Sequence, residues 1–389
     1  MGRLVQTTNQ KNTCYDQFEL SKIIRIQLKL QEQFSKSITM KKLNSKHVIL
    51  MFFQVLFLIS CRDDGNVVPE EPVVKTSTVL NGIKVSTWMY QIQWLDEKAT
   101  IDELDATPYD MLVVEPGHNF KTDIYNTKYL VSSLKEKPNG DERLLLAYID
   151  IGQAEDYRSY WESSWIAPTE TDIGTPDFLL TIDPDGWSGN YPVAYWDTRW
   201  LDIWLGVNGI IKQLADFGFD GVYLDWVEAY DDDKVRETAS QEGVDPEKEM
   251  MNFIEGIRTT GRSINPNFLV VSQNAPYLLD EDPNRYISII DALATEDTWF
   301  YGEGDVLWDN PNAGDLSGGD RHASDYSTAN RITQNAKYLD LGIPVFSVDY
   351  CISETNAKQT YINAYRNGFI PLVTRVPLTN ITETPPLFE

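Results

Sequence analysis

The sequence predicts an α/β fold: a single (β/α)8 TIM barrel preceded by a lipoprotein signal peptide and a short linker. From residue 79 onward, short β-rich runs alternate with longer helical patterns, which is typical of parallel βα units. In addition, polar residues end most of the β-rich runs, and barrel enzymes build their sites at that end of the strands. A doubly wound open sheet is the alternative, but no glycine-rich phosphate loop follows the first run.

Residues 40–60 are predicted to be the signal peptide. Two lysines follow Met40, an apolar run extends from Val48 to Ile59, and the Leu-Ile-Ser-Cys sequence that ends at Cys61 resembles a lipobox. We therefore expect cleavage before Cys61, lipidation of its thiol and a place in the bacterial cell envelope as an outer-membrane lipoprotein. The acidic residues after Cys61 point to surface exposure, with a periplasmic orientation left open. A plain signal anchor is the alternative to a lipoprotein.

These features divide the chain into four parts. Because Met40 is the natural start of the signal peptide, residues 1–39 are interpreted as a spurious upstream extension. Residues 61–78, which are acidic and contain two prolines, form a flexible tether. Residues 79–389 form the barrel domain.

Composition excludes several classes of function. The formal net charge of −26 makes nucleic acid and anionic lipid poor partners, so membrane attachment is expected only through the anchor. Three cysteines and three histidines, without metal-ligand spacing, argue against a disulfide framework, a histidine-based triad and a metal centre. We expect no metal and a monomer, and this composition leaves the chemistry to carboxylates, tyrosines and amides.

Eight runs are predicted to be the barrel strands: Lys84–Gln91, Met111–Glu115, Arg143–Ile151, Pro192–Trp196, Gly221–Trp226, Leu269–Asn274, Ile289–Glu296 and Pro344–Tyr350. Helices are predicted between them at Leu201–Phe217, Pro246–Ile264, Thr328–Leu341 and Glu354–Asn367. Asp245 before Pro246 is a favourable start for a helix, and Gly218 stands where a helix should end.

Two carboxylates are predicted to carry the chemistry. In the stretch Gly218–Asp225, Tyr223 and Asp225 share one face of a strand, so Asp225 should project into the barrel mouth, with Tyr223 or Asn274 as hydrogen-bond donors. Glu296 follows small residues on a second strand, and the charge of Asp225 should raise its pKa. A pair of carboxylates across one cleft is what glycoside hydrolysis requires. The alternatives are that Asp225 caps the next helix and that Asp297 takes the role of Glu296.

The other polar and aromatic residues near the strand ends are predicted to bind a polysaccharide or oligosaccharide substrate, because aromatic faces stack on sugar rings while acids and amides bind hydroxyl or ammonium groups. They are Tyr90, Trp94, Glu115, Tyr148, Asp150, Trp196, Asp197, Tyr223, Asn274, Asp349 and Tyr350. By contrast, Asp220 lies at the opposite end of its strand and is predicted to be structural.

Several stretches together resemble glycoside hydrolase family 114, the endo-α-1,4-polygalactosaminidase family: residues 88–91 (WMYQ), 145–157 (LLAYIDIGQAEDY), 195–197 (YWD), 218–225 (GFDGVYLD), 272–274 (SQN), 296–297 (ED) and 348–350 (VDY). The resemblance implies a TIM barrel without a cofactor that hydrolyses α-linked galactosamine polymers. It also implies that Asp225 is the nucleophile and Glu296 the acid/base of a retaining mechanism.

Two other functions remain open at this stage. One is a non-catalytic carbohydrate-binding lipoprotein that uses the barrel mouth as a receptor, against which the presence of both Asp225 and Glu296 argues. The other is a hydrolase of a different cell-surface glycan on the same barrel. Residues 152–155 read Gly-Gln-Ala-Glu where many relatives have Gly-Glu-Ala-Glu. This difference bears on which sugar the site binds more than on the reaction.

Overall fold

The computed structural model describes residues 73–117, 126–317 and 326–386. The signal peptide, Cys61 and most of the tether lie outside these residues, so lipidation and localisation stay predictions. Among the described residues, no helix is both long enough and apolar enough to cross a membrane. The fold described below belongs to the unit Pro72–Glu389.

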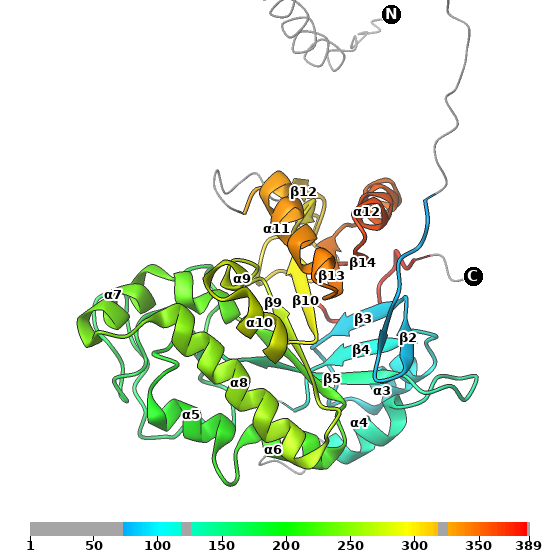
Figure 1. Cartoon of the computed structure of the whole chain (residues 1–389). Helices are drawn as coiled ribbons and strands as arrows, with labels where there is room; N and C mark the ends of the chain where they lie inside the picture. The colour runs from blue at the N-terminus through cyan, green and yellow to red at the C-terminus, as the bar shows by residue number, and fades with distance from the viewer. Residues whose placement is uncertain (1–72, 118–125, 318–325, 387–389) are drawn as a thin grey trace, which may run out of the picture. The chain divides into compact units, whose positions relative to one another are not determined.

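Eight parallel strands form the central sheet, in chain order, and their bounds are β3 Trp88–Gln91, β4 Met111–Val114, β5 Leu144–Asp150, β8 Gly221–Asp225, β9 Leu269–Gln273, β10 Ala292–Glu296, β13 Val345–Tyr350 and β14 Ile370–Thr374. The two ends of the sheet approach each other: β14 lies beside β3, and the Trp88 indole donates to the carbonyl of Ile370 at 3.0 Å. The sheet is therefore a nearly closed TIM-like barrel, as predicted (Figure 1).

One predicted strand is wrong. Residues 192–196 do not join the barrel; instead β7 (Asn190–Pro192) pairs antiparallel with β6 (Gln153–Glu155) outside it. The chain then turns at Asp197, whose side chain caps the following helix. The eighth barrel strand is β14, which lies near the C-terminus and contains Pro371. Asp225 and Glu296 consequently end the fourth and sixth barrel strands, not the fifth and seventh.

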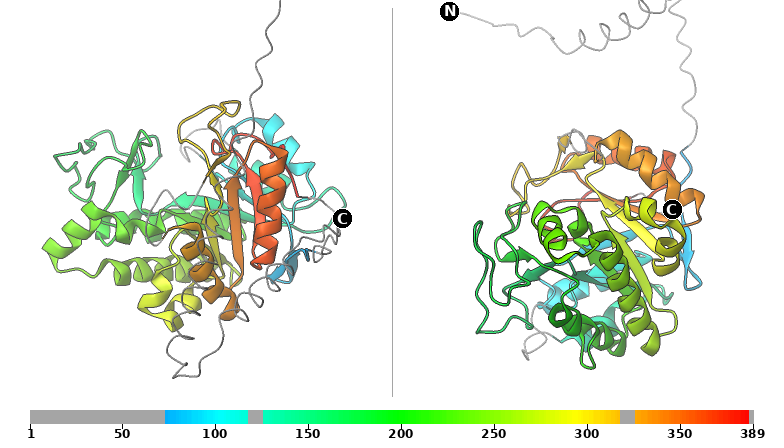
Figure 2. Two further views of the ribbon diagram at one scale, coloured as in Figure 1. Left: turned by 90° about the horizontal axis from the view of Figure 1, so that it is seen from above. Right: turned by 60° about the vertical axis from the view of Figure 1, so that its left-hand side comes forward.

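Helices follow most of the barrel strands. Their bounds are α3 Lys98–Asp105, α4 Thr127–Leu134, α5 Thr198–Leu205, α6 Ile210–Phe217, α7 Asp233–Glu242, α8 Pro246–Ile264, α9 Leu278–Glu281, α10 Pro283–Ile289, α11 Thr328–Asp340 and α12 Glu354–Arg366. Figure 2 shows α11 and α12 covering the part of the sheet formed by β13 and β14, in agreement with their contacts. Three short pairs complete the structure: β1 Thr78–Leu80 with β2 Ile83–Val85, β6 with β7, and β11 Phe300–Tyr301 with β12 Leu316–Ser317.

Local signals explain the helix boundaries. The side chain of Asp245 accepts the backbone N–H of Lys248, and Pro246 occupies the first turn of α8, as predicted. Gly218 adopts a left-handed conformation (φ 99°) after α6. The single helix predicted over residues 201–217 is two helices, because Gly206–Gly209 interrupts it. A side chain at Gly206 would approach the carbonyl of Asp202 to 2.4 Å.

Aromatic side chains fill the barrel interior beneath its mouth. Trp88 is fully buried and contacts Tyr223 and Phe346, with ring centroids 6.1 and 5.6 Å apart. Tyr90 lies above this layer, 5.1 Å from the ring of Tyr223 and 5.9 Å from that of Tyr148. The barrel is therefore packed rather than hollow, and this packing supports the polar residues at its carboxyl end.

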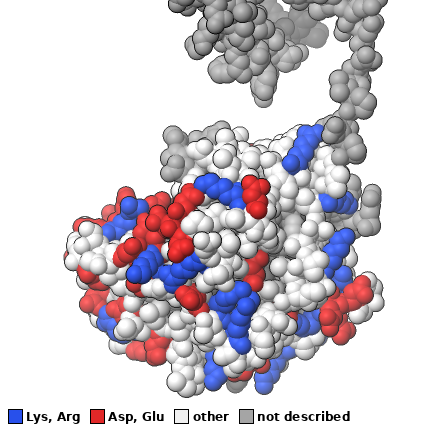
Figure 3. All heavy atoms as spheres, viewed as in Figure 1, with Lys and Arg blue, Asp and Glu red and all other residues white. Residues whose placement is uncertain are grey.

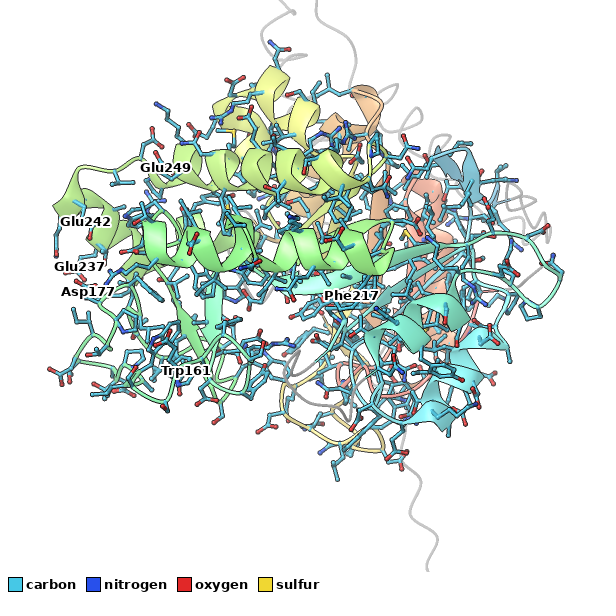
Figure 4. The ribbon with its side chains drawn as sticks, turned by 90° about the horizontal axis from the view of Figure 1, so that it is seen from below. Trp161, Asp177, Phe217, Glu237, Glu242 and Glu249 are labelled. Atoms are coloured by element: carbon cyan, nitrogen blue, oxygen red, sulfur yellow. The ribbon has the colours of Figure 1, made fainter. Side chains whose placement is uncertain are left out.

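The segment between β5 and α5 forms an irregular insertion with its own aromatic packing. Tyr160 meets the buried rings of Trp200 and Trp204 with centroids 5.5 and 6.1 Å apart. Figure 4 shows Trp161 and Asp177 of this insertion on the same side of the molecule as Glu237 and Glu242 of α7. The Trp196 indole donates to Glu242 at 2.7 Å, which joins the insertion to α7.

Candidate active site

A cavity of about 770 Å³ lies at the carboxyl ends of the barrel strands. Strands β3, β4, β5, β8, β9, β10 and β13, or the residues just after them, contribute its base, and the insertion, the loops around β11 and the segment 376–378 form its walls. Eight of the predicted site residues meet there: Tyr90, Glu115, Tyr148, Asp150, Asp225, Asn274, Glu296 and Tyr350.

Asp225, the last residue of β8, is held by two hydrogen bonds. The Tyr148 hydroxyl donates to its Oδ2 at 2.7 Å, and the backbone N–H of Trp226 donates to its Oδ1 at 2.8 Å. In the register of the sheet Tyr148 of β5 lies opposite Tyr223, one layer below Asp225, and its long side chain reaches the carboxylate from there. The predicted donors Tyr223 and Asn274 do not make these bonds. Burial raises the pKa of Asp225, while both donors counteract that rise.

Glu296, the last residue of β10, is surrounded by amides and a tyrosine. The side-chain amides of Gln273 and Asn274 donate to its Oε2, the latter at 2.9 Å, and the Tyr350 hydroxyl donates to its Oε1. Burial, followed by the negative charges of Asp225 and Asp297, raises the pKa of Glu296 to about 8. The rise and the contribution of Asp225 agree with the prediction. Glu296 therefore keeps a proton near neutral pH, whereas the donors to Asp225 oppose the rise in its pKa.

Glu228 also lines this cavity, although it was not among the predicted site residues. It lies on the short 3-10 helix η1 (Val227–Asp231), three residues after Asp225. Its Oε2 is buried and has no hydrogen-bond partner among the described residues. Burial, with the charges of Asp225 and Glu296, raises the pKa of Glu228 well above its ordinary value.

Among the described residues, two arginines line the cavity, and both contact neighbouring groups. Arg158 forms ion pairs with Glu115 at 2.7 Å and with Glu155 at 2.6 Å. Arg331 donates to the backbone carbonyl of Glu296 and so supports the end of β10. Asp150 accepts the backbone N–H groups of Gly152 and Gln153 at 3.0 and 2.8 Å, which shapes the turn after β5. Arg158, Glu155 and Arg331 were not predicted to be site residues: Arg158 lies in a loop, Glu155 ends the short strand β6 outside the barrel, and Arg331 lies on α11.

The remaining predicted site residues lie outside the cavity lining. Tyr223 is fully buried below the mouth, and Asp349 accepts the backbone N–H groups of Trp299 and Phe300 at 2.6 and 2.9 Å. Burial raises the pKa of Asp349 to about 8. Trp196 and Asp197 lie in the insertion and at the start of α5, while Trp94 lines a separate hollow. Asp220 accepts the backbone N–H of Leu145 at 2.8 Å, which confirms its structural placement.

Three residues that directly follow barrel strands have left-handed backbones. Trp226, Asn274 and Asp297 have φ values of 53°, 54° and 54°, which is unusual for residues other than glycine. This turn lets the backbone N–H of Trp226 reach Asp225 and the side chain of Asn274 reach Glu296. Such conformations cost about 1–3 kcal/mol each and persist where neighbouring contacts hold them, often at functional sites.

The described lining is strongly acidic. Eleven carboxylates face two arginines: Glu115, Asp150, Glu155, Asp185, Asp225, Glu228, Asp231, Asp232, Glu296, Asp297 and Glu303. No group of His, Cys, Asp and Glu among the described residues has the arrangement of a metal site. On the outer surface in Figure 3, acidic side chains are densest on the side of α7. The cavity therefore favours cationic or hydrogen-bond-donating ligands over anions.

Comparison with known proteins identifies the family. The model of glycoside-hydrolase family GH114 matches residues 72–386, so the chain belongs to this family. An uncharacterized protein of Deinococcus radiodurans is 31% identical over 284 residues, covering 70% of this chain and 75% of that protein. Another, from Thermotoga maritima, is 29% identical over 302 residues, covering 75% of this chain and 81% of that protein.

A solved structure supports the fold. The glycoside hydrolase domain of PelA from Pseudomonas aeruginosa superimposes with a TM-score of 0.51 at 13% sequence identity, covering 76% of this chain and 96% of that domain. At this level of identity the likeness shows the barrel architecture alone.

The charge of Asp225 should be visible in the titration of Glu296. Replacing Asp225 by Asn removes a negative charge that disfavours ionisation of Glu296, so the pKa of Glu296 should fall below its value of about 8. Carbon NMR of labelled carboxyl groups, with Glu296→Gln used for assignment, measures this. Asp220→Asn, at the far end of the same strand, is the matched control. An unchanged Glu296 titration in Asp225→Asn would show that the two carboxyls are not coupled.

Proposed function

We propose that this chain hydrolyses glycosidic bonds in an amino-sugar polysaccharide, with Asp225 and Glu296 as the catalytic carboxyls. The observation that carries the proposal is the pair itself: both side chains line one cavity at the carboxyl end of the barrel, and burial together with the charge of Asp225 raises the pKa of Glu296 to about 8. Glycoside hydrolysis uses one ionised and one protonated carboxyl in this way. Membership of a glycoside-hydrolase family supports the same reaction.

Asp225 acts as the nucleophile in this proposal. Its carboxylate attacks the anomeric carbon and forms a glycosyl ester while the bond to the leaving oxygen breaks. The Tyr148 hydroxyl and the Trp226 N–H stabilise the anion before attack and orient its oxygens. The Tyr90 and Tyr148 rings beside it supply a rigid, partly apolar wall for the sugar.

Glu296 acts first as acid and then as base. Because its Oε2 already accepts two amide N–H bonds, the acid proton is left to Oε1, beside the Tyr350 hydroxyl. In the first step this proton passes to the leaving oxygen. In the second step the carboxylate takes a proton from water, which attacks the anomeric carbon and releases Asp225, so that the anomeric configuration is retained.

The acidic lining supports an amino-sugar substrate. The excess of acidic side chains attracts the ammonium group of an amino sugar and repels the carboxylate of a uronic acid. Both cavity arginines are held by acidic side chains or backbone carbonyls, which weakens any attraction to an anionic sugar. The substrate class implied by the sequence resemblance fits this lining.

Loss of either carboxyl should abolish most of the activity without unfolding the chain. Asp225→Asn and Glu296→Gln preserve shape but remove the nucleophile and the acid, so kcat should fall about 10²- to 10⁴-fold. Asp220→Asn should retain kcat within about threefold, because it lies at the opposite end of β8. Azide should restore turnover to Asp225→Ala and give a glycosyl azide of inverted configuration. Near wild-type rates in both variants on a confirmed substrate would show that the pair is misassigned.

Substrate charge provides an independent test. A partly deacetylated galactosamine polymer should be cleaved with a higher kcat/KM than its fully acetylated form, and a uronic-acid polymer should be the poorest of the three. The release of reducing ends, measured at low and high ionic strength, gives these rates. The differences in kcat/KM between the polymers should become smaller at high ionic strength, because salt screens the charges. Faster cleavage of the uronate polymer would contradict the proposed substrate. Binding of the amino-sugar polymer without release of ends would favour a receptor function instead.

A further inference from the structure

A second hollow, of about 350 Å³, lies on the other side of one cavity wall. It is lined by Gln91, Trp94, Glu97, Thr100, Glu103, Thr379 and Asn380, and we call it the Trp94 pocket. The wall consists of Ile92 and Gln93 after β3 and residues 376–378 after β14, which line the catalytic cavity. The N–H groups of Ile92 and Gln93 both point to the carbonyl of Leu378, at 3.1 and 3.4 Å. The two hollows are therefore neighbours across a hydrogen-bonded strip of chain.

Trp94 presents a large aromatic surface in this pocket. Its side chain is 59% exposed, although tryptophan is largely buried on average. Its backbone is left-handed, with φ of 60°, a conformation that is disfavoured for a bulky residue. The carbonyl of Trp94 accepts the N–H of Glu97 at 3.2 Å, which fixes the turn. An exposed aromatic face matches the apolar face of a sugar ring.

Polar groups beside Trp94 lack partners among the described residues. Gln91 is only 1% exposed, and its Nε2 donates to the carbonyl of Thr379 at 2.8 Å. Its Oε1 and the Oγ1 of Thr379 are buried without a hydrogen bond. An unsatisfied buried polar atom destabilises the folded chain, so a bound group that supplies a hydrogen bond here would recover part of that loss.

The charge of the pocket selects the class of ligand. Glu97 and Glu103 line it, no lysine or arginine does so in the described structure, and neither glutamate has an ion pair with a described residue. Glu97 precedes α3 without capping it through its side chain, so its carboxylate is not used by the helix. Two carboxylates next to an aromatic face suit a sugar that carries an ammonium group.

We propose that the Trp94 pocket is a second carbohydrate-binding site, which holds an amino-sugar unit of the polysaccharide outside the catalytic cavity. The inference rests on the proposed function for its ligand class. A chain that leaves the cavity over the wall at Ile92 and Leu378 meets Trp94 next. The site would therefore contribute affinity for long chains, since binding at a second point on one chain raises the effective concentration at the first.

Binding to a chain that cannot be cleaved tests the inference without relying on turnover. The full protein carrying Asp225→Asn is titrated with a long, partly deacetylated galactosamine polymer by calorimetry, with and without Trp94→Ala. We expect Trp94→Ala to weaken binding at least fivefold. Leu307→Ala is the control: Leu307 is 83% exposed and lines neither hollow, so this change should leave binding unaltered.

A second pair of substitutions tests the two glutamates of the Trp94 pocket. Glu97→Gln with Glu103→Gln should weaken binding of the partly deacetylated polymer while leaving binding of the fully acetylated polymer within twofold. Equal binding with and without Trp94→Ala would overturn the Trp94 pocket as a binding site and leave the proposed function standing. Failure of the Asp225→Asn chain to bind either polymer would overturn the proposed substrate and this inference with it. Circular dichroism of each variant checks that its fold is intact.

Discussion

Burial of several carboxyls at one end of the barrel is the constraint on which the rest of the site depends. Asp225 and Glu296 are both desolvated, and their mutual repulsion opposes ionisation of both at neutral pH. Hydrogen-bond donors reach both carboxyls and oppose these rises in pKa. A tyrosine hydroxyl and a backbone N–H hold the anion of Asp225, whereas the charge of that anion helps Glu296 to remain protonated.

The scaffold supplies those donors through register and through strained turns. Tyr148 lies opposite Tyr223 in the pairing of β5 with β8, and its hydroxyl reaches Asp225 in the layer above. The rings of Trp88, Tyr223 and Phe346 pack against one another below the barrel mouth. Left-handed residues after β8 and β9 then bring an N–H and an amide to the two carboxyls. The same arrangement leaves Glu228 buried beside them, at a cost that the packed barrel must offset.

Local signals made most of the fold predictable. Asp245 and Pro246 mark the start of α8, and period-two patterns place Asp225 and Glu296 at the barrel mouth. The eighth strand, β14, was not predicted because it contains Pro371, which is unusual within a strand. The apolar residues after Pro192 have the pattern of a strand, although they do not join the barrel. Contacts between strands could not be predicted from the pattern within one strand: Tyr223 shares the face of Asp225, but the donor is Tyr148 of the neighbouring strand, whose register partner is Tyr223.

The most direct test of the account is to trap the covalent intermediate. The Glu296→Gln chain, incubated with an aryl galactosaminide whose leaving group needs no protonation, lacks the base that activates water, so the glycosyl ester should accumulate. Intact-protein mass spectrometry should show the addition of one glycosyl unit, and peptide mapping should locate it on Asp225. Turnover without an adduct and with an inverted product, or an adduct on another carboxyl, would contradict the assignment of Asp225 as nucleophile and Glu296 as acid/base.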